Sequence, residues 1–188
     1  MHTNAGKSNH WICTSRQGGS IVHVMDSLGL FMSLNLFTVL QIAKIYSLPK
    51  SQSVLQIHKM SVQQQHGTLD CGLFAIAYAV EVCLGRKPQC ASFIQKKMRE
   101  HLFACLTKGM LTPFPITSDS EMLPRPTPVV HKIQLYCICR MPEEYDEEMI
   151  SCDIWFHTTC KCQETSTAVE MQPLWALNNQ IILYGVLY

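Results

Sequence analysis

Charge is scarce in this sequence and is almost balanced. Charged residues make up 15% of the 188 positions, and the formal net charge is +1. Proteins that bind nucleic acids in general carry a clear excess of Lys and Arg on one face. The composition therefore gives no electrostatic support for direct binding to nucleic acid.

The sequence also lacks the apolar segments that direct a chain into or across a membrane. Residues 1–10 are polar and do not have the pattern of a secretory signal. The longest mostly apolar stretch, 28–48, is interrupted by polar residues such as Asn35 and Lys44, which argues against a membrane span. We expect no membrane association.

Cysteine, in contrast, is abundant. The chain has 10 cysteines, and five of them lie between positions 137 and 162, which is the crowding typical of a metal site. Without a secretory signal, a disulfide scaffold is not favoured, and we expect a reducing compartment, the nucleus or the cytoplasm. The length fits one domain, or one small domain followed by a smaller module.

A candidate nucleophile lies where a polar loop meets an apolar segment. The Gln-rich loop ends in Asp70-Cys71-Gly72, and the apolar run 73–84 that follows is interrupted only by Glu81. This run predicts a buried helix of about three turns with Cys71 in its first turn. The helix dipole there favours a thiolate. A cysteine in front of an apolar helix is also commonly an inert core residue, so Cys71 alone does not establish catalysis.

A β-hairpin is predicted further upstream. Segments 10–15 and 20–26 are rich in β-formers, and Gln17-Gly18-Gly19 between them has the composition of a turn. The start of the first strand of a hairpin lies beside the end of the second, so the pairing brings His10 next to Asp26. A carboxylate beside an imidazole fixes its tautomer and stabilises the imidazolium.

The order of these motifs resembles a known enzyme family. His10-Trp11 comes first, Asp26-Ser27 follows sixteen residues later, and Gln65 precedes Cys71 by six residues. This arrangement is similar to the ubiquitin-like-protein peptidases, the SUMO-deconjugating cysteine proteases. The resemblance implies an α+β fold with a papain-like or adenain-like core, in which a sheet packs on a buried helix that bears the cysteine.

The resemblance also implies the activity and the role of each residue. The activity is cleavage of a ubiquitin-like modifier, or its conjugates, after a C-terminal Gly-Gly. The implied catalytic residues are His10 as general base, Asp26 as its orienting group, Gln65 as oxyanion donor and Cys71 as nucleophile. Gln63 and Gln64 could compete for the oxyanion role, although the spacing favours Gln65. Trp11 is either the roof of the substrate channel or an ordinary core residue.

Other elements can be predicted from local patterns. Segment 36–46 has helical spacing and segment 54–60 reads as a strand. Ser92 and Gln95 fit a capping box for a helix that ends near Leu106. Segment 112–134 holds five of the nine prolines and predicts an extended linker. Because family members have further elements before their His-Trp motif, we expect residues 1–111 to form a partial, poorly stable peptidase domain.

The segment 135–162 combines cysteines, aromatic residues and acidic residues. Its pattern resembles a PHD finger, a module that binds zinc. By this resemblance the ligands of the first zinc site are Cys137, Cys139, His157 and Cys160, a Cys3His set. The second site keeps only Cys152 and, at most, Cys162, because the stretch after Asp153 is shortened. We expect one zinc ion in the finger and none in catalysis.

The finger suggests an alternative function. PHD fingers of this type bind methylated lysine in histone tails through an aromatic cage. The candidate cage residues are Tyr136, Met149 and Trp155. The chain would then be a non-catalytic, zinc-binding reader of histone tails, or a degenerate protein derived from a transposon, since transposon-derived genes combine a peptidase with a finger. No function is predicted for residues 163–188.

Overall fold

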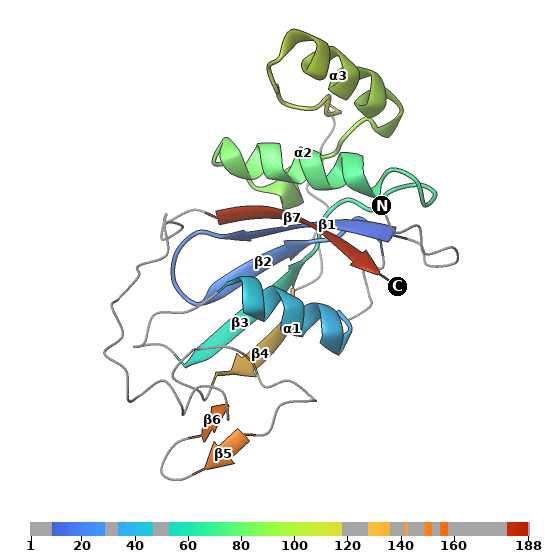
Figure 1. Cartoon of the computed structure of the whole chain (residues 1–188). Helices are drawn as coiled ribbons and strands as arrows, with labels where there is room; N and C mark the ends of the chain where they lie inside the picture. Colours follow the sequence, from blue (N-terminus) through green and yellow to red (C-terminus); the bar gives the residue numbers. More distant parts are fainter. Residues whose placement is uncertain are drawn as a thin grey trace.

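The computed structural model describes residues 9–28, 34–46, 53–117, 128–135, 142, 149–151, 155–157 and 180–187. These residues form a mixed α/β fold built on a five-stranded sheet of order β4-β3-β2-β1-β7 (Figure 1). The strands of this sheet are β1 (Asn9–Arg16), β2 (Ile21–Met25), β3 (Val54–Met60), β4 (Val129–Gln134) and β7 (Gln180–Leu187). The helices are α1 (Leu36–Ile45), α2 (Cys71–Cys83), the short 3₁₀ helix η1 (Pro88–Cys90) and α3 (Gln95–Lys108).

The predicted hairpin is confirmed. Strands β1 and β2 pair antiparallel, with Ser15 opposite His23, next to the turn. Gly18 and Gly19 in that turn have φ angles of 86° and 66°, in the left-handed region that glycine enters without a steric penalty. The turn therefore depends on this Gly-Gly pair.

A helical crossover follows the hairpin. Strands β2 and β3 pair in parallel, and α1 lies between them in the chain, so the predicted helix and strand are both confirmed. The side chain of Asn35 caps α1 by accepting a hydrogen bond from the Thr38 amide at 2.8 Å. Residues of α1 such as Val39 and Ile42 pack on one face of the sheet.

Helix α2 covers the opposite face of the sheet, as Figure 1 shows. Its buried residues, among them Phe74 and Tyr78, pack with Cys13 and Met25 from β1 and β2. The helix is apolar on nearly every face because α3 and η1 also pack against it. No helix in the described ranges combines the length and apolar character needed to cross a membrane.

The start of α3 differs from the prediction. Its N-cap is Ile94, which makes no side-chain capping bond, so Ser92 and Gln95 do not form a capping box. Gln95 is the first residue of the helix, and its side chain instead hydrogen-bonds the main chain of His66 and the carboxylate of Asp70. These long-range contacts replace the local cap.

Two strands of the sheet come from beyond the predicted peptidase domain 1–111. The end of the predicted linker 112–134 forms β4, which pairs antiparallel with β3, so this part is not a linker. The tail 163–188, for which no role was predicted, contains β7, which pairs antiparallel with β1. Both strands are rich in β-branched or other large apolar residues, and each finds an edge strand to pair with.

The finger segment is described only in part. Strands β5 (Met149–Ser151) and β6 (Trp155–His157) pair antiparallel, with Met149 opposite His157 and Ser151 opposite Trp155. The side chains of Met149, Trp155 and His157 are outside the described part of the structure. The remaining predicted finger residues, Tyr136, Cys137, Cys139, Cys152, Cys160 and Cys162, also lie outside it.

Candidate active site

The structure brings His10 and Asp26 into direct contact, as the hairpin predicts. His10 Nε2 lies 2.6 Å from Asp26 Oδ1, and both residues are buried, with relative exposures of 2% and 1%. His10 is near the start of β1, and Asp26 follows the last residue of β2. The antiparallel pairing of these strands therefore positions both side chains at one end of the sheet.

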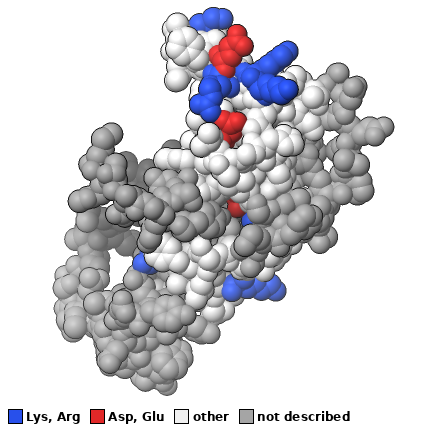
Figure 2. Space-filling view, turned by 90° about the vertical axis from the view of Figure 1, so that its right-hand side faces the viewer, with Lys and Arg blue, Asp and Glu red and all other residues white. Residues whose placement is uncertain are grey.

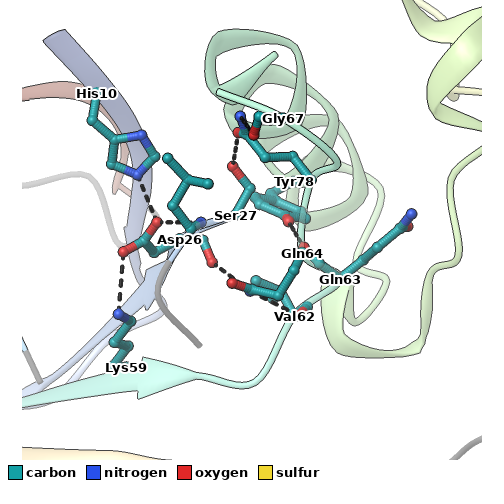
Figure 3. Close-up of polar contacts among 11 residues, drawn as sticks. His10, Asp26, Ser27, Lys59, Val62, Gln63, Gln64, Gly67 and Tyr78 are labelled. Carbon is teal, nitrogen blue, oxygen red and sulfur yellow. Dashed lines mark hydrogen bonds and ion pairs between the residues drawn. The ribbon is translucent and has the colours of Figure 1, made fainter. Parts of the chain in front are cut away.

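The Asp26 carboxylate has two further partners. The Leu28 amide donates to Oδ1 at 2.8 Å. Lys59 Nζ lies 3.1 Å from Oδ2, as Figure 3 shows on the side opposite His10. Burial alone raises the pKa of Asp26, but the His10 hydrogen bond, the Lys59 charge and the Leu28 amide outweigh it and lower the pKa below its ordinary value. Asp26 is therefore an ionised acceptor at neutral pH.

An ionised Asp26 determines the tautomer of His10. A carboxylate can only accept hydrogen bonds, so the His10 nitrogen that faces it, Nε2, carries the proton. The basic nitrogen of the neutral ring is then Nδ1. A carboxylate behind one ring nitrogen, with the other nitrogen able to accept a proton, is an arrangement that can serve as a general base.

Gln65 is held by the residue that follows Asp26. The Ser27 hydroxyl donates to the side-chain oxygen of Gln65, Oε1, at 2.7 Å. The main-chain N–H of Gln65 donates to the Ser27 carbonyl at 2.9 Å. Gln65 Nε2 donates to the Gly67 carbonyl at 2.8 Å. Because Ser27 fixes the oxygen, the NH2 group faces the loop that leads to Cys71, and an amide nitrogen has a second hydrogen to donate.

The competing glutamines have other partners. Gln63 Oε1 accepts from the Phe93 amide at 2.5 Å, and Gln63 Nε2 donates to the Phe93 carbonyl at 3.1 Å. Gln64 Nε2 donates to the carbonyls of Asp26 and Val62 at 3.1 and 3.3 Å. These contacts tie Gln63 to Phe93 and Gln64 to Asp26 and Val62. Gln65 stays the candidate oxyanion donor because of its spacing from Cys71.

Cys71 is the first residue of α2 and is a free, buried cysteine. Helix α2 packs against β1, the strand that carries His10. The pairing of the Cys71 sulfur with the His10 ring stays a prediction. The main-chain amides in the first turn of α2 are the donors that a helix start offers to an anion.

Trp11 lies beside the residue that follows Cys71. A methyl group built on Gly72 would be 3.7 Å from the Trp11 Cδ1 atom. The Trp11 side chain is 46% exposed, so it is not an ordinary core residue. Of the two interpretations left by the sequence, its position over the start of α2 fits the roof of a channel better, and that role stays a prediction.

The loop before Cys71 is tied to α3 by charge. Asp70 pairs with Arg99 at 2.5 Å and accepts a hydrogen bond from Gln95 at 2.7 Å. Figure 2 shows Lys and Arg side chains gathered at the top of the molecule, over α3. Asp70 makes no side-chain capping bond to α2, and its contacts with α3 anchor the loop immediately before Cys71.

The sequence predicts no role for Lys59, and it marks Ser27 only as part of the Asp26-Ser27 motif. A signal for Lys59 was present, because strand alternation places it on the same face of β3 as the buried residues Leu55 and Ile57. A lysine on the apolar face of a strand needs a buried counter-charge. No local signal indicates the contact of Ser27 with Gln65, which joins distant parts of the chain.

Comparisons with protein-family models, with curated proteins and with solved structures find no match to this chain. Within the described residues, no group of three or more His, Cys, Asp or Glu side chains is arranged to hold a metal ion. The function is therefore argued from the geometry around His10, Asp26 and Gln65 and from the order of the motifs.

Proposed function

We propose that this protein is a cysteine peptidase or isopeptidase of the ubiquitin-like-protein type, with a papain-like or adenain-like core. The observation that carries the proposal is the buried contact of 2.6 Å between His10 Nε2 and Asp26 Oδ1. An adjacent Ser27 orients Gln65, and Cys71 starts the buried helix that packs on the same strand as His10. Together these residues supply a base, its orienting acid, an oxyanion donor and a nucleophile.

In this mechanism His10 Nδ1 removes the proton from the Cys71 thiol, and Asp26 stabilises the resulting imidazolium. The thiolate attacks the carbonyl carbon of the last glycine of the modifier. The Gln65 Nε2 group and the main-chain amide of Cys71 stabilise the oxyanion. The imidazolium then donates its proton to the leaving amine, and water hydrolyses the thioester with His10 again as base.

The geometry near Trp11 suggests the substrate. Its ring lies beside Gly72, the residue after Cys71. By the family resemblance this ring roofs a channel for the Gly-Gly tail of a ubiquitin-like modifier. The free cysteines of the described residues suit a reducing compartment, so we place the reaction in the nucleus or the cytoplasm.

The direct test is covalent capture of a ubiquitin-like modifier that carries a thiol-reactive electrophile in place of its C-terminal carboxylate. We expect the full chain to form a stable adduct and Cys71→Ala to form none. Cys90→Ala is the matched control, because Cys90 is an exposed free cysteine away from the site. His10→Ala should slow capture by at least about 100-fold. Capture that persists in Cys71→Ala would contradict the assignment.

A second candidate function belongs to segment 135–162, where β5 and β6 pair antiparallel. The donor set Cys137, Cys139, His157 and Cys160 has the chemistry of a structural zinc site, and zinc would stabilise the fold of so small a module. With Tyr136, Met149 and Trp155 nearby in sequence, the module would bind a methylated histone tail. Binding of trimethylated over unmodified histone peptides by the full chain, lost in Trp155→Ala, would support this function.

A further inference from the structure

Lys59 is a buried cation in the middle of the proposed site. It lies near the end of β3 and is only 5% exposed. Its Nζ atom is 3.1 Å from Asp26 Oδ2, and the Asp26 side chain is fully enclosed. Burying an ammonium group is costly unless an opposite charge lies close to it. The contact with Asp26 supplies that charge.

The two oxygens of the Asp26 carboxylate have different partners. Oδ1 faces His10 and the Leu28 amide, whereas Oδ2 faces Lys59. Figure 3 shows His10 and Lys59 approaching the carboxylate from opposite sides. Contacts on both oxygens restrict rotation of the carboxylate about its Cβ–Cγ bond, so Lys59 helps to hold Oδ1 in line with His10.

We propose that Lys59 is a positioning residue that holds the Asp26 carboxylate in the orientation in which Oδ1 faces His10. The inference rests on the proposed function, because it concerns how the base of that site is oriented. Without the contact on Oδ2, the carboxylate can rotate about its Cβ–Cγ bond, and His10 loses the fixed partner that determines its tautomer.

The test compares Lys59→Met and Lys59→Gln, which remove the charge, with Lys59→Arg, which keeps it. The primary measurement is the rate at which the full chain is captured by the modifier that carries the electrophile. We expect both neutral variants to slow capture by about 10-fold or more, because a base without a fixed partner is less often oriented to accept the Cys71 proton. Lys59→Arg, which keeps a cation for Oδ2, should stay within about threefold of wild type.

The second measurement is the pH dependence of Cys71 alkylation by iodoacetamide, with folding of each variant checked by circular dichroism. The part of this profile that depends on His10, identified with His10→Gln, should be weakened in the neutral variants and kept in Lys59→Arg. A neutral variant that folds but keeps the wild-type capture rate and profile would overturn the role of Lys59. A wild-type Cys71 that titrates as an ordinary thiol, unaffected by His10→Gln, would instead overturn the proposed function.

Discussion

The hydroxyl of Ser27 donates to the side-chain oxygen of Gln65 at 2.7 Å, in a buried contact between the end of β2 and the loop before α2. The residue before Ser27 is Asp26, which contacts His10. One dipeptide thus orients both the proposed base and the proposed oxyanion donor. Because Asp26 and Ser27 are adjacent in the chain, a shift of one would displace the other. The position of His10 therefore depends on that of Gln65.

This contact leads to the first prediction. Ser27→Ala removes the hydroxyl that fixes the oxygen of Gln65, so the amide can rotate and present its oxygen to the oxyanion. We expect kcat on a fluorogenic modifier substrate to fall by about 10-fold or more, with little change in KM, because the loss concerns the transition state. Thr68→Ala, at an exposed position of the same loop, is the control and should be active. Equal kcat values for the two variants would contradict the role of Ser27.

The second prediction concerns the Asp26 charge and stability. Asp26→Asn removes the counter-charge of the buried Lys59 and should lower the free energy of unfolding by about 3 kcal/mol near neutral pH. Asp70→Asn is the matched control. It breaks the more exposed pair with Arg99 and should cost less than about 1 kcal/mol. Urea denaturation of the three proteins gives both values, and a similar loss in both variants would be against the prediction.

The same variant tests a dependence on pH. The pKa of Asp26 is lowered from its ordinary value of 3.8, so its contribution to stability is present above that pH in the wild type. The contribution is lost as the pH falls through the lower pKa of the folded state. The difference in unfolding free energy between wild type and Asp26→Asn should therefore narrow in acid. A difference that is constant from about pH 7 to pH 3 would show that Asp26 does not titrate in this way.

The elements that could be predicted from the sequence are those with a local signal. The hairpin follows from β-formers around Gly18 and Gly19, and α2 follows from an apolar run of helical length. The contact of His10 with Asp26 follows from hairpin pairing alone. The residues of this part of the site could be named because their positions depend on short stretches of chain.

The elements that could not be predicted depend on pairing between distant segments. The prolines around β4 indicate a linker, and only the open edge of β3 makes residues 129–134 a strand. In the same way, the sequence of 180–187 indicates only an apolar segment, and its pairing with β1 makes it the strand β7. Such partners are chosen by tertiary packing, which local propensity does not encode. Strand alternation marks Lys59 as buried, but its ion-pair partner, Asp26, follows a different strand, so the pair could not be predicted from local pattern.

The third prediction concerns zinc in segment 135–162. Metal analysis of the purified full chain should give one tightly bound zinc ion, because the second ligand set of a PHD-type finger is incomplete in this sequence. His157→Ala should lose that ion, whereas Cys152→Ala, outside the first ligand set, should keep it. Two bound ions in the wild-type protein, or zinc that is lost equally in both variants, would disprove this ligand assignment.

The last prediction concerns β7, which pairs with β1 along the strand that carries His10 and Trp11. A chain that ends at residue 179 loses this pairing and exposes the edge of β1, and it also loses Ile181, which packs partly buried against the α2 side of the core. Ile181 alone should account for about 1 kcal/mol, since a fully buried side chain of this size contributes roughly 1.5–3 kcal/mol. The shortened protein should therefore melt at a lower temperature and, with an open strand edge, aggregate more readily. Ile181→Ala separates the two effects, because it removes the side chain but keeps the backbone pairing. If the shortened chain melts like Ile181→Ala and stays monomeric by light scattering, then β7 contributes packing only and does not protect the edge of the strand that bears the proposed base.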